Sequence, residues 1–278
     1  MAGIRIINKD ANYSALGLGN VNKSEIYIST INLTNTTQRT AIRALYNSLK
    51  TTGLDKKFKV FRLFYAGTSL ADSINLMNPV TGVAANQATY VSDNASYHTA
   101  SGWTPNGAAG HYAISNYLLN EDINKVHFHA WNSTTPSNSN SFLLAQQANA
   151  TGNAFYIALQ RKGSGPFAKG AITPYSSVFN LNAPSGYDTH TGLLSVARQA
   201  GGIMKLYDDA VEVISATRAD TWSMNNTSML LEGTIGSSAT TNYADCTLRF
   251  LGWGSSEWTT TDEVNLNTIL KAFYLAIA

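Results

Sequence analysis

The sequence predicts a mainly-β protein, a sandwich of two antiparallel sheets with one helix before it and one helix at its C-terminal end. From residue 58 to residue 250, short apolar runs alternate with turns rich in Asn, Ser, Gly and Pro, at the spacing typical of a β-sandwich. Two other segments, 35–52 and 260–277, carry their apolar residues on one helical face. Hydrophobic residues form 44% of the chain, which is enough for a core and excludes disorder as the global state.

The first 33 residues are predicted to form an N-terminal arm, or attachment segment. We expect two short β segments in this arm, Ile4–Ile7 and Ile26–Ile31, separated by a stretch rich in Gly and Asn. Residues 34–278 are expected to form one unit of helix, sandwich and C-terminal helix. A chain of 278 residues suits a single domain of this kind, because β-sandwiches often exceed ~200 residues.

The segment 35–52 is the clearest predicted helix. Asn35 and Gln38 have the spacing of a capping box, and Gly53 stands where a glycine commonly ends a helix. The apolar residues that share one face are Ala41, Ile42, Leu45 and Leu49. We expect this face to pack on a sheet. A single short apolar face gives little support to the alternative, a helix that joins three copies of the chain.

The best predicted strands are 126–130, 154–160, 193–198, 203–207, 210–215 and 247–251. Tyr207–Ala210 joins two of them and is predicted to be a hairpin turn, because Asp tolerates the backbone conformation of such turns. Asn132–Ser141, which contains Pro136, is predicted to be a polar loop without a core residue.

The last element is predicted to be a helix that docks on the sandwich. Thr260 and Glu263 have the Thr-x-x-Glu spacing of a capping box. The residues of its apolar face are Leu266, Ile269, Leu270, Phe273 and Ile277.

Charge and composition exclude several classes of partner. Charged residues form 13% of the chain and the formal net charge is +2, which is too small to favour nucleic acid or an anionic membrane surface. Asn, Ser and Thr number 27, 26 and 29, so the surface is polar but mostly uncharged. No apolar run approaches the ~20 residues of a membrane-spanning helix, and the N-terminal stretch MAGIRIINKD lacks the ~7–15 apolar residues of a signal-peptide core. We therefore expect a chain that stays in a cytosol or leaves it without a conventional signal, as in a virion assembled inside a host cell.

The sequence gives little sign of catalysis or of metal binding. None of the 6 Glu residues is followed two places later by an acidic residue, so no strand carries a carboxylate pair on one face. His127 and His129 share a strand face, which is more typical of a polar sheet surface than of a metal site. The single cysteine, Cys246, excludes an intrachain disulfide. We expect no catalytic residue, no metal and no cofactor. Calcium at Asp208 and Asp209 is the one alternative, although a hairpin turn explains these residues more simply.

Aromatic residues next to polar segments are the best candidates for ligand contacts. Sugars stack their apolar faces on aromatic rings and bond their hydroxyl groups to polar side chains. Four of the five Trp residues lie beside segments rich in Ser, Thr, Asn and Gly, where loops are expected. The candidate ligand-binding residues are Trp103, Asn106, Trp131, Tyr187, Trp222 and Trp258.

Four blocks of sequence, in a fixed order, together resemble one family. They are AIRALYNSLKTTGLDKKFKVFRLFYAG followed by INLMNP, then GWTPNGAAGHYAISNYLLN, then GLLSVARQAGGIMKLYDDAVEVIS, and finally LRFLGWGSSEWTTTDEVNLNTILKAFYLAI. Over roughly residues 35–278 the chain is similar to concanavalin A-like, laminin-G-like proteins of phages and prophages that infect Bacteroidetes-type hosts. The common hairpin turn of that family is Asn-Gly, whereas this chain has Asp208-Asp209.

The resemblance implies a concanavalin A-like jelly roll and a role in a virion, and it transfers no catalytic residue. Our first hypothesis is a non-enzymatic virion structural protein, such as a tail-fibre, receptor-binding or head-appendage subunit, whose lectin-like sandwich contacts host surface glycans. The expected partners are other virion proteins bound through the arm, further copies of the chain in a homo-oligomer, and host surface polysaccharide. The alternatives are a glycan-cleaving depolymerase or glycosidase on the same fold, and a capsid or tail cementing protein without a ligand.

Overall fold

The computed structural model describes most of the chain from residue 22 onwards. The ranges that it describes are 22–82, 87–105, 112–118, 123–137, 141–146, 156–162, 168–173, 180–218, 229–232 and 244–278. The predicted β segment Ile4–Ile7 lies outside these ranges. Within them, no helix combines the length and the apolar character needed to cross a bilayer.

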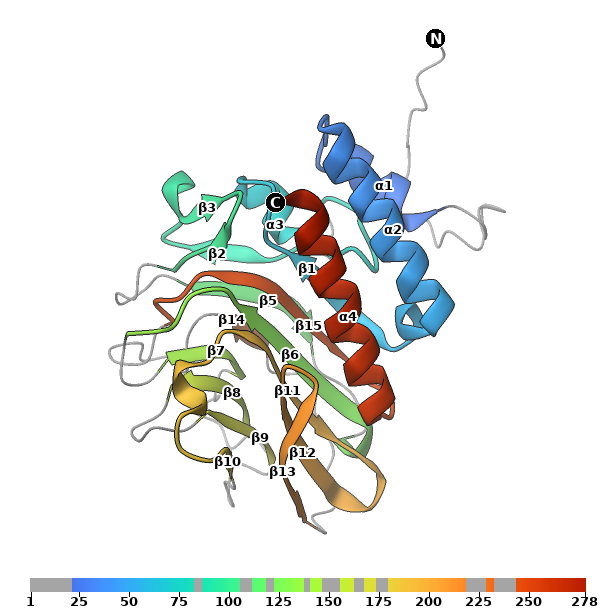
Figure 1. Cartoon of the computed structure of the whole chain (residues 1–278). Helices are drawn as coiled ribbons and strands as arrows, with labels where there is room; N and C mark the ends of the chain where they lie inside the picture. Colours follow the sequence, from blue (N-terminus) through green and yellow to red (C-terminus); the bar gives the residue numbers. More distant parts are fainter. Residues whose placement is uncertain are drawn as a thin grey trace.

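Two antiparallel sheets form the sandwich, which confirms the predicted fold class (Figure 1). Among the described strands, the first sheet has the order β13 (Val211–Thr217), β12 (Ile203–Asp208), β11 (Gly192–Arg198), β6 (Val126–Asn132), β15 (Leu248–Gly254), β4 (Gly102–Trp103) and β3 (His98–Thr99), with β1 (Phe58–Leu63) also paired to β15. The second sheet has the order β10 (Leu181–Asn182), β9 (Lys169–Thr173), β8 (Tyr156–Lys162), β7 (Ser141–Gln146), β14 (Met229–Glu232), β5 (Tyr112–Leu118) and β2 (Thr89–Val91).

The six strands predicted best from the sequence all exist, with ends shifted by a few residues. β6 and β11 are buried along their whole length, because the second sheet covers one face of the first sheet and helices cover the other. The predicted hairpin between β12 and β13 is also present. Its two turn residues are Asp209 and Ala210, with φ angles of 49° and 72°, so the turn lies one residue later than the Asp208-Asp209 pair.

The predicted first helix is α2 (Thr36–Thr52). Asn35 caps it, since its side chain accepts a hydrogen bond of 3.1 Å from the backbone N–H of Gln38. Gly53 ends it in the left-handed region with a φ of 76°. The apolar face packs against α4 (Thr260–Ile277), as well as against the region around β1.

The predicted β segment Ile26–Ile31 is wrong, because these residues lie in and just after a helix, α1 (Lys23–Thr30). Asn22 caps this helix through the backbone N–H of Ser24 at 3.1 Å. Tyr27 and Ile28 point into the apolar cluster shared with α2. Part of the predicted arm therefore belongs to the helical layer, while the arm's role in attachment stays a prediction.

Helix α4 is the predicted C-terminal helix, but its capping box lies one residue earlier than expected. Thr259 accepts a hydrogen bond from the backbone N–H of Asp262, and Asp262 accepts one from the backbone N–H of Thr259. Glu263 is thereby freed from capping and points inward, where it is fully buried. In Figure 1, α4 crosses the first sheet in front of β6, β11 and β15, with α1 and α2 beside it.

Two apolar cores result from this layering. One lies between the sheets and includes Phe128, Trp253 and Leu206. The other lies between the outer face of the first sheet and the helices, and includes Trp131, Phe250 and residues of α1, α2 and α4. The short helix α3 (Ser69–Ser73) borders the second core through Ile74.

The predicted polar loop Asn132–Ser141 is shorter than expected. Its ends belong to strands, and Asn132 and Ser141 are both fully buried. Pro136 is buried as well, which contradicts the expectation that the loop has no core residue. The reason is that Asn132 and Ser141, at the two ends of the segment, pair with neighbouring strands and are thereby drawn into the sandwich.

Candidate functional site

Several loops meet at one end of the sandwich. The register pairs Asn132, the last residue of β6, with Gly192 at the start of β11 and with Leu248 at the start of β15. The loops that follow β6, precede β11 and precede β15 therefore share this end. Asn132 joins two of them, because its side-chain N–H₂ donates to the carbonyl oxygens of Thr134 and His190, both at 3.1 Å.

A buried ion pair connects the two sheets at this end. Arg161, on β8 of the second sheet, donates from Nη1 to Oδ2 of Asp208 on β12 of the first sheet at 2.9 Å. Its Nε donates to Oδ1 of Asn132 at 3.0 Å, and its Nη2 donates to the carbonyl oxygen of Gly192 at 3.2 Å. Each nitrogen of the Arg161 guanidinium has a hydrogen-bond partner, which offsets the cost of burying its charge, whereas Oδ1 of Asp208 is buried without one. The ion pair fixes the position of the loops around it.

An aromatic pair lies over this ion pair and reaches the surface. His190 is 50% exposed, and its Nδ1 lies 2.9 Å from Oδ2 of Asp208. The ring of Tyr187 lies 4.7 Å from that of His190, and Tyr187 is half-buried against the core between the sheets. Because an ionised Asp208 only accepts, Nδ1 carries the proton, and Nε2 of a neutral ring is an acceptor. We call Tyr187 and His190 the aromatic platform.

A second polar group lies in the opposite face of the first sheet, sealed beneath α4. Its polar side chains are fully buried. They form a chain of hydrogen bonds that begins on α4 and ends at the residue before β1. Ser195 Oγ lies 2.7 Å from Oε1 of Glu263 and 2.7 Å from Nδ1 of His129. His129 Nε2 lies 2.7 Å from Nδ1 of His127, whose Nε2 lies 3.3 Å from the carbonyl oxygen of Lys57. Ser, His and Glu occur in hydrolases, where His lies between Ser and the carboxylate, but here Ser195 bonds to both other groups and all of these side chains are fully buried.

The protonation of Glu263 decides whether this chain is fully bonded. If Glu263 is ionised, Ser195 donates a hydrogen bond to Glu263. His129 then donates from Nδ1 to Ser195, and His127 donates from Nδ1 to His129. His127 Nε2 then faces the Lys57 carbonyl without a proton. If Glu263 is protonated, each hydrogen bond of the chain runs in the opposite direction. His127 Nε2 then carries a proton and donates it in a hydrogen bond to the Lys57 carbonyl, so every bond has a donor. Burial raises the pKa of Glu263 to about 7 and lowers the pKa of His127 to about 3, which favours the protonated acid with neutral rings.

Comparisons with known proteins agree with the geometry of the sandwich. A sialidase from Trypanosoma rangeli, in complex with 2,3-difluorosialic acid, is similar over 84% of this chain and 40% of its own, with a TM-score of 0.55 and 10% identity. A structure of botulinum neurotoxin type C, described by its interaction with two ganglioside molecules, covers 79% of this chain and 53% of its own, with a TM-score of 0.53 and 11% identity. The binding domain of botulinum neurotoxin serotype D covers 77% and 52%, with a TM-score of 0.51 and 10% identity.

The chain has a lectin-like β-sandwich fold. It spans about half the length of the two toxin chains that it matches. No protein-family model matches the sequence, and no curated protein does.

The lectin-like sandwich places the six predicted ligand-binding residues in different environments. Trp103 on β4 and Trp131 on β6 are 2% and 9% exposed, and Trp258, just before α4, is fully buried. Their expected position in solvent-facing loops is therefore wrong: the two strands turn their rings into the cores, and Glu263 accepts a hydrogen bond of 2.8 Å from Nε1 of Trp258. Asn106 and Trp222 lie outside the described residues.

Tyr187 is the predicted site residue that the described structure leaves half-buried rather than buried. The sequence did not single out His190 or Arg161. His190 follows Tyr187 by three residues, a short spacing that is a usable signal. Arg161 has none, because its partners Asn132 and Asp208 lie 29 and 47 residues away in the sequence.

The residues weighed as metal ligands have other partners. His127 and His129 bond to each other inside the protein rather than on a polar sheet face. Asp208 binds Arg161, and Asp209 accepts from the backbone N–H of Leu193 at 3.1 Å. Over the described ranges, no three His, Cys, Asp or Glu side chains come together in a way that could hold a metal ion.

Proposed function

We propose that this domain binds a glycan on the aromatic platform and does not cleave it. The observation that carries the proposal is the pair of neighbouring rings, Tyr187 and His190, at a loop-rich end of a lectin-like sandwich. A sugar ring stacks its C–H face on such aromatic surfaces, and the surrounding hydroxyl groups bond to its own. Ser185 and Thr189 are exposed and lie within two residues of the rings in the sequence, so they can supply such groups.

The buried residues below the platform support binding because they hold it in one geometry. Asp208 positions the His190 ring through Nδ1, and Arg161 holds Asp208. A preorganised site of this kind loses little conformational entropy on binding. Nε2 of His190 is then available as a hydrogen-bond partner for a sugar hydroxyl.

The experiment is a binding screen of the full chain against a panel of bacterial surface polysaccharides and gangliosides, with product analysis on the same samples. Tyr187→Ala is expected to reduce binding about 5- to 30-fold, since a stacked ring contributes on the order of 1–2 kcal/mol. Tyr97→Ala is the matched control, because Tyr97 is also half-buried against the core between the sheets but lies elsewhere. Equal affinity of Tyr187→Ala and wild type for every bound glycan would contradict the platform.

A glycan-cleaving enzyme is the second candidate, and the likeness to the sialidase supports it. Such an enzyme needs two carboxyl groups facing the scissile bond, commonly about 5–9 Å apart. Near the platform, Asp208 is 3% exposed and bound to Arg161, and Asp188 is 8% exposed. Shortened glycan products in the screen would overturn the non-enzymatic proposal. Absence of both binding and cleavage would favour the ligand-free cementing role.

The finer proposal is that the domain is a phage virion subunit, attached through the N-terminal arm to other virion proteins and assembled with copies of itself. The order of the four sequence blocks supports it. Mass spectrometry of purified particles from a host that carries the gene tests this directly. The chain is expected in amounts comparable to other tail or head proteins, and its absence from intact particles would contradict the proposal.

A further inference from the structure

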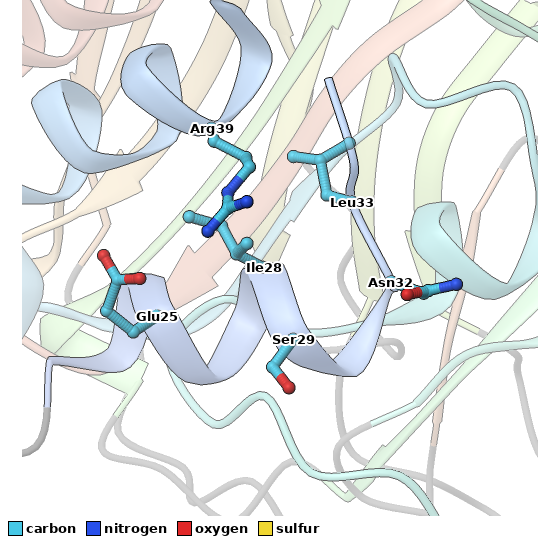
Figure 2. A pocket seen from close by; sticks show the side chains of 6 residues that line it. All are labelled: Glu25, Ile28, Ser29, Asn32, Leu33 and Arg39. Atoms are coloured by element: carbon cyan, nitrogen blue, oxygen red, sulfur yellow. The ribbon is translucent and has the colours of Figure 1, made fainter. Parts of the chain in front are cut away.

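A polar pocket of about 260 Å³ lies between α1 and the beginning of α2, away from the aromatic platform (Figure 2). The residues that line it are Glu25, Ile28 and Ser29 of α1, Asn32 and Leu33 of the turn, and Arg39 of α2. Figure 2 shows the guanidinium of Arg39 extending from α2 towards α1, next to Ile28. Asn32 adopts a φ of 51°, and this left-handed residue turns the chain sharply between the two helices.

Two arginines one helical turn apart on α2, Arg39 and Arg43, differ in their hydrogen-bond partners. Arg43 binds Glu25 with two hydrogen bonds, from Nε to Oε1 at 2.5 Å and from Nη2 to Oε2 at 3.0 Å. The Nε of Arg39 is buried without a hydrogen-bond partner, and the side chain of Arg39 makes no ion pair with any residue that the structure describes. The hydrogen bond from Arg43 is the main cause that lowers the pKa of Glu25, and the charge of Arg39 adds a smaller effect from a distance.

A lone guanidinium selects the chemistry of its partner. Its planar fork of N–H donors matches a carboxylate, which accepts two parallel hydrogen bonds. Glu25, the carboxylate that lines the same pocket, already binds Arg43, so the partner has to come from outside these two helices.

The rest of the lining sets the size and character of that partner. A volume of about 260 Å³ is just below the ~300–1,000 Å³ of pockets for drug-sized ligands, so it suits a molecule of about one sugar ring. Ile28 and Leu33 provide an apolar wall, and Ser29 and Asn32 provide hydrogen-bonding groups. We propose that this pocket binds a sugar acid, with the carboxylate on Arg39 and the hydroxylated ring between Ser29, Asn32 and the apolar wall.

The test is a titration of the full chain with D-glucuronate, followed by calorimetry and by the NMR signals of the Ile28 and Leu33 methyl groups. D-Glucose is the matched neutral sugar, and acetate is the bare carboxylate. Saturable binding of glucuronate, at least about tenfold tighter than either control compound, is expected. Acetate as tight as glucuronate would overturn the sugar-acid proposal, since it would leave an adventitious anion site only.

Charge variants test which groups are responsible. Arg39→Gln is expected to weaken glucuronate binding at least about tenfold without unfolding the protein, because Arg39 has no partner to lose. Glu25→Gln is expected to strengthen it, since a like charge beside the ligand is removed. Lys50→Gln, the same charge change at an exposed position of α2, is the control and should change nothing.

Unchanged affinity in Arg39→Gln, or weaker binding in Glu25→Gln, would overturn the site. Tyr187→Ala separates this inference from the proposed glycan function, because it should leave glucuronate binding intact. Loss of glucuronate binding in Tyr187→Ala would place the ligand on the platform instead and would also overturn the pocket.

Discussion

Lowering the pH from about 7 to about 5 is expected to weaken the fold through the groups sealed beneath α4. Burial lowers the pKa of His127 to about 3 and that of His129 well below its ordinary value, so both rings stay neutral in the fold. The unfolded chain protonates both rings below their ordinary pKa of about 6.5. Each ring therefore reduces the free energy of unfolding by about 1.4 kcal/mol for every pH unit below that value.

Glu263 acts in the opposite direction. Burial raises its pKa to about 7, so the fold keeps a proton that the unfolded chain releases above about pH 4.5. Its contribution is complete below that pH, and it is lost as the pH rises through about 7, by about 3 kcal/mol in total. Between about pH 4.5 and 6.5 the two histidines outweigh the one glutamate, and the net change is about 1.4 kcal/mol per unit. The cluster therefore stabilises the protein most near pH 6.5.

Glu263→Gln isolates the glutamate contribution, because the amide keeps the shape but does not titrate. Urea unfolding, followed by tryptophan fluorescence at about pH 5, 6 and 7, measures the free energy of unfolding of both proteins. The variant is expected to gain about 1.4 kcal/mol relative to wild type for each unit of rising pH. Glu212→Gln, which removes an exposed carboxyl of β13 that binds Lys205, is the control for the loss of a surface carboxyl. A constant or falling difference for Glu263→Gln would refute the reasoning, since it would mean that the buried carboxyl is ionised in the fold.

Three further changes test the described geometry by thermal and urea unfolding. Arg161→Met is expected to cost about 3–5 kcal/mol by leaving the buried Asp208 without its arginine partner, and a second change, Asp208→Asn, should recover part of it. Ala210→Gly should stabilise the protein by up to about 1 kcal/mol, because a φ of 72° suits glycine; a loss would contradict the turn. Gly202→Ala should cost more than Gly82→Ala, although both have a φ of 76°, because only position 202 has a backbone carbonyl in the way of a new Cβ. Equal costs would mean that backbone strain alone decides.

The sequence predicted most of the sheet because the sandwich strands carry their own local signals. β6 and β11 are continuous apolar runs bounded by turns, so their burial on two faces is visible in the sequence. α1 was predicted as a β segment because β-branched isoleucines at 26, 28 and 31 favour strands. The cap at Asn22 and the packing of Tyr27 against residues distant in sequence stabilise a helix instead. Neither is apparent from the local β propensity.

The candidate site was less predictable than the fold. Tyr187 was identified because aromatic residues in polar loops are common ligand contacts. The tryptophans fail the same criterion for a physical reason: Trp103 and Trp131 sit in strands whose inward positions demand large apolar groups. Arg161 and Arg39 matter through what surrounds them, a complete set of partners for one and none for the other, and a single sequence records neither.

The position of β15 has a consequence for the order in which the protein is made. This strand comes near the end of the described sequence, yet it lies inside the first sheet, where its register joins Phe58 to Gly254 and Gly252 to His129. During translation, β1 therefore has no strand partner until β15, which follows it by about 185 residues, has also been synthesised. The first sheet is thus completed by contacts distant in sequence, which makes for slow folding. A chain released before β15 would expose the open edges of β1 and β6, where other chains can pair and aggregate.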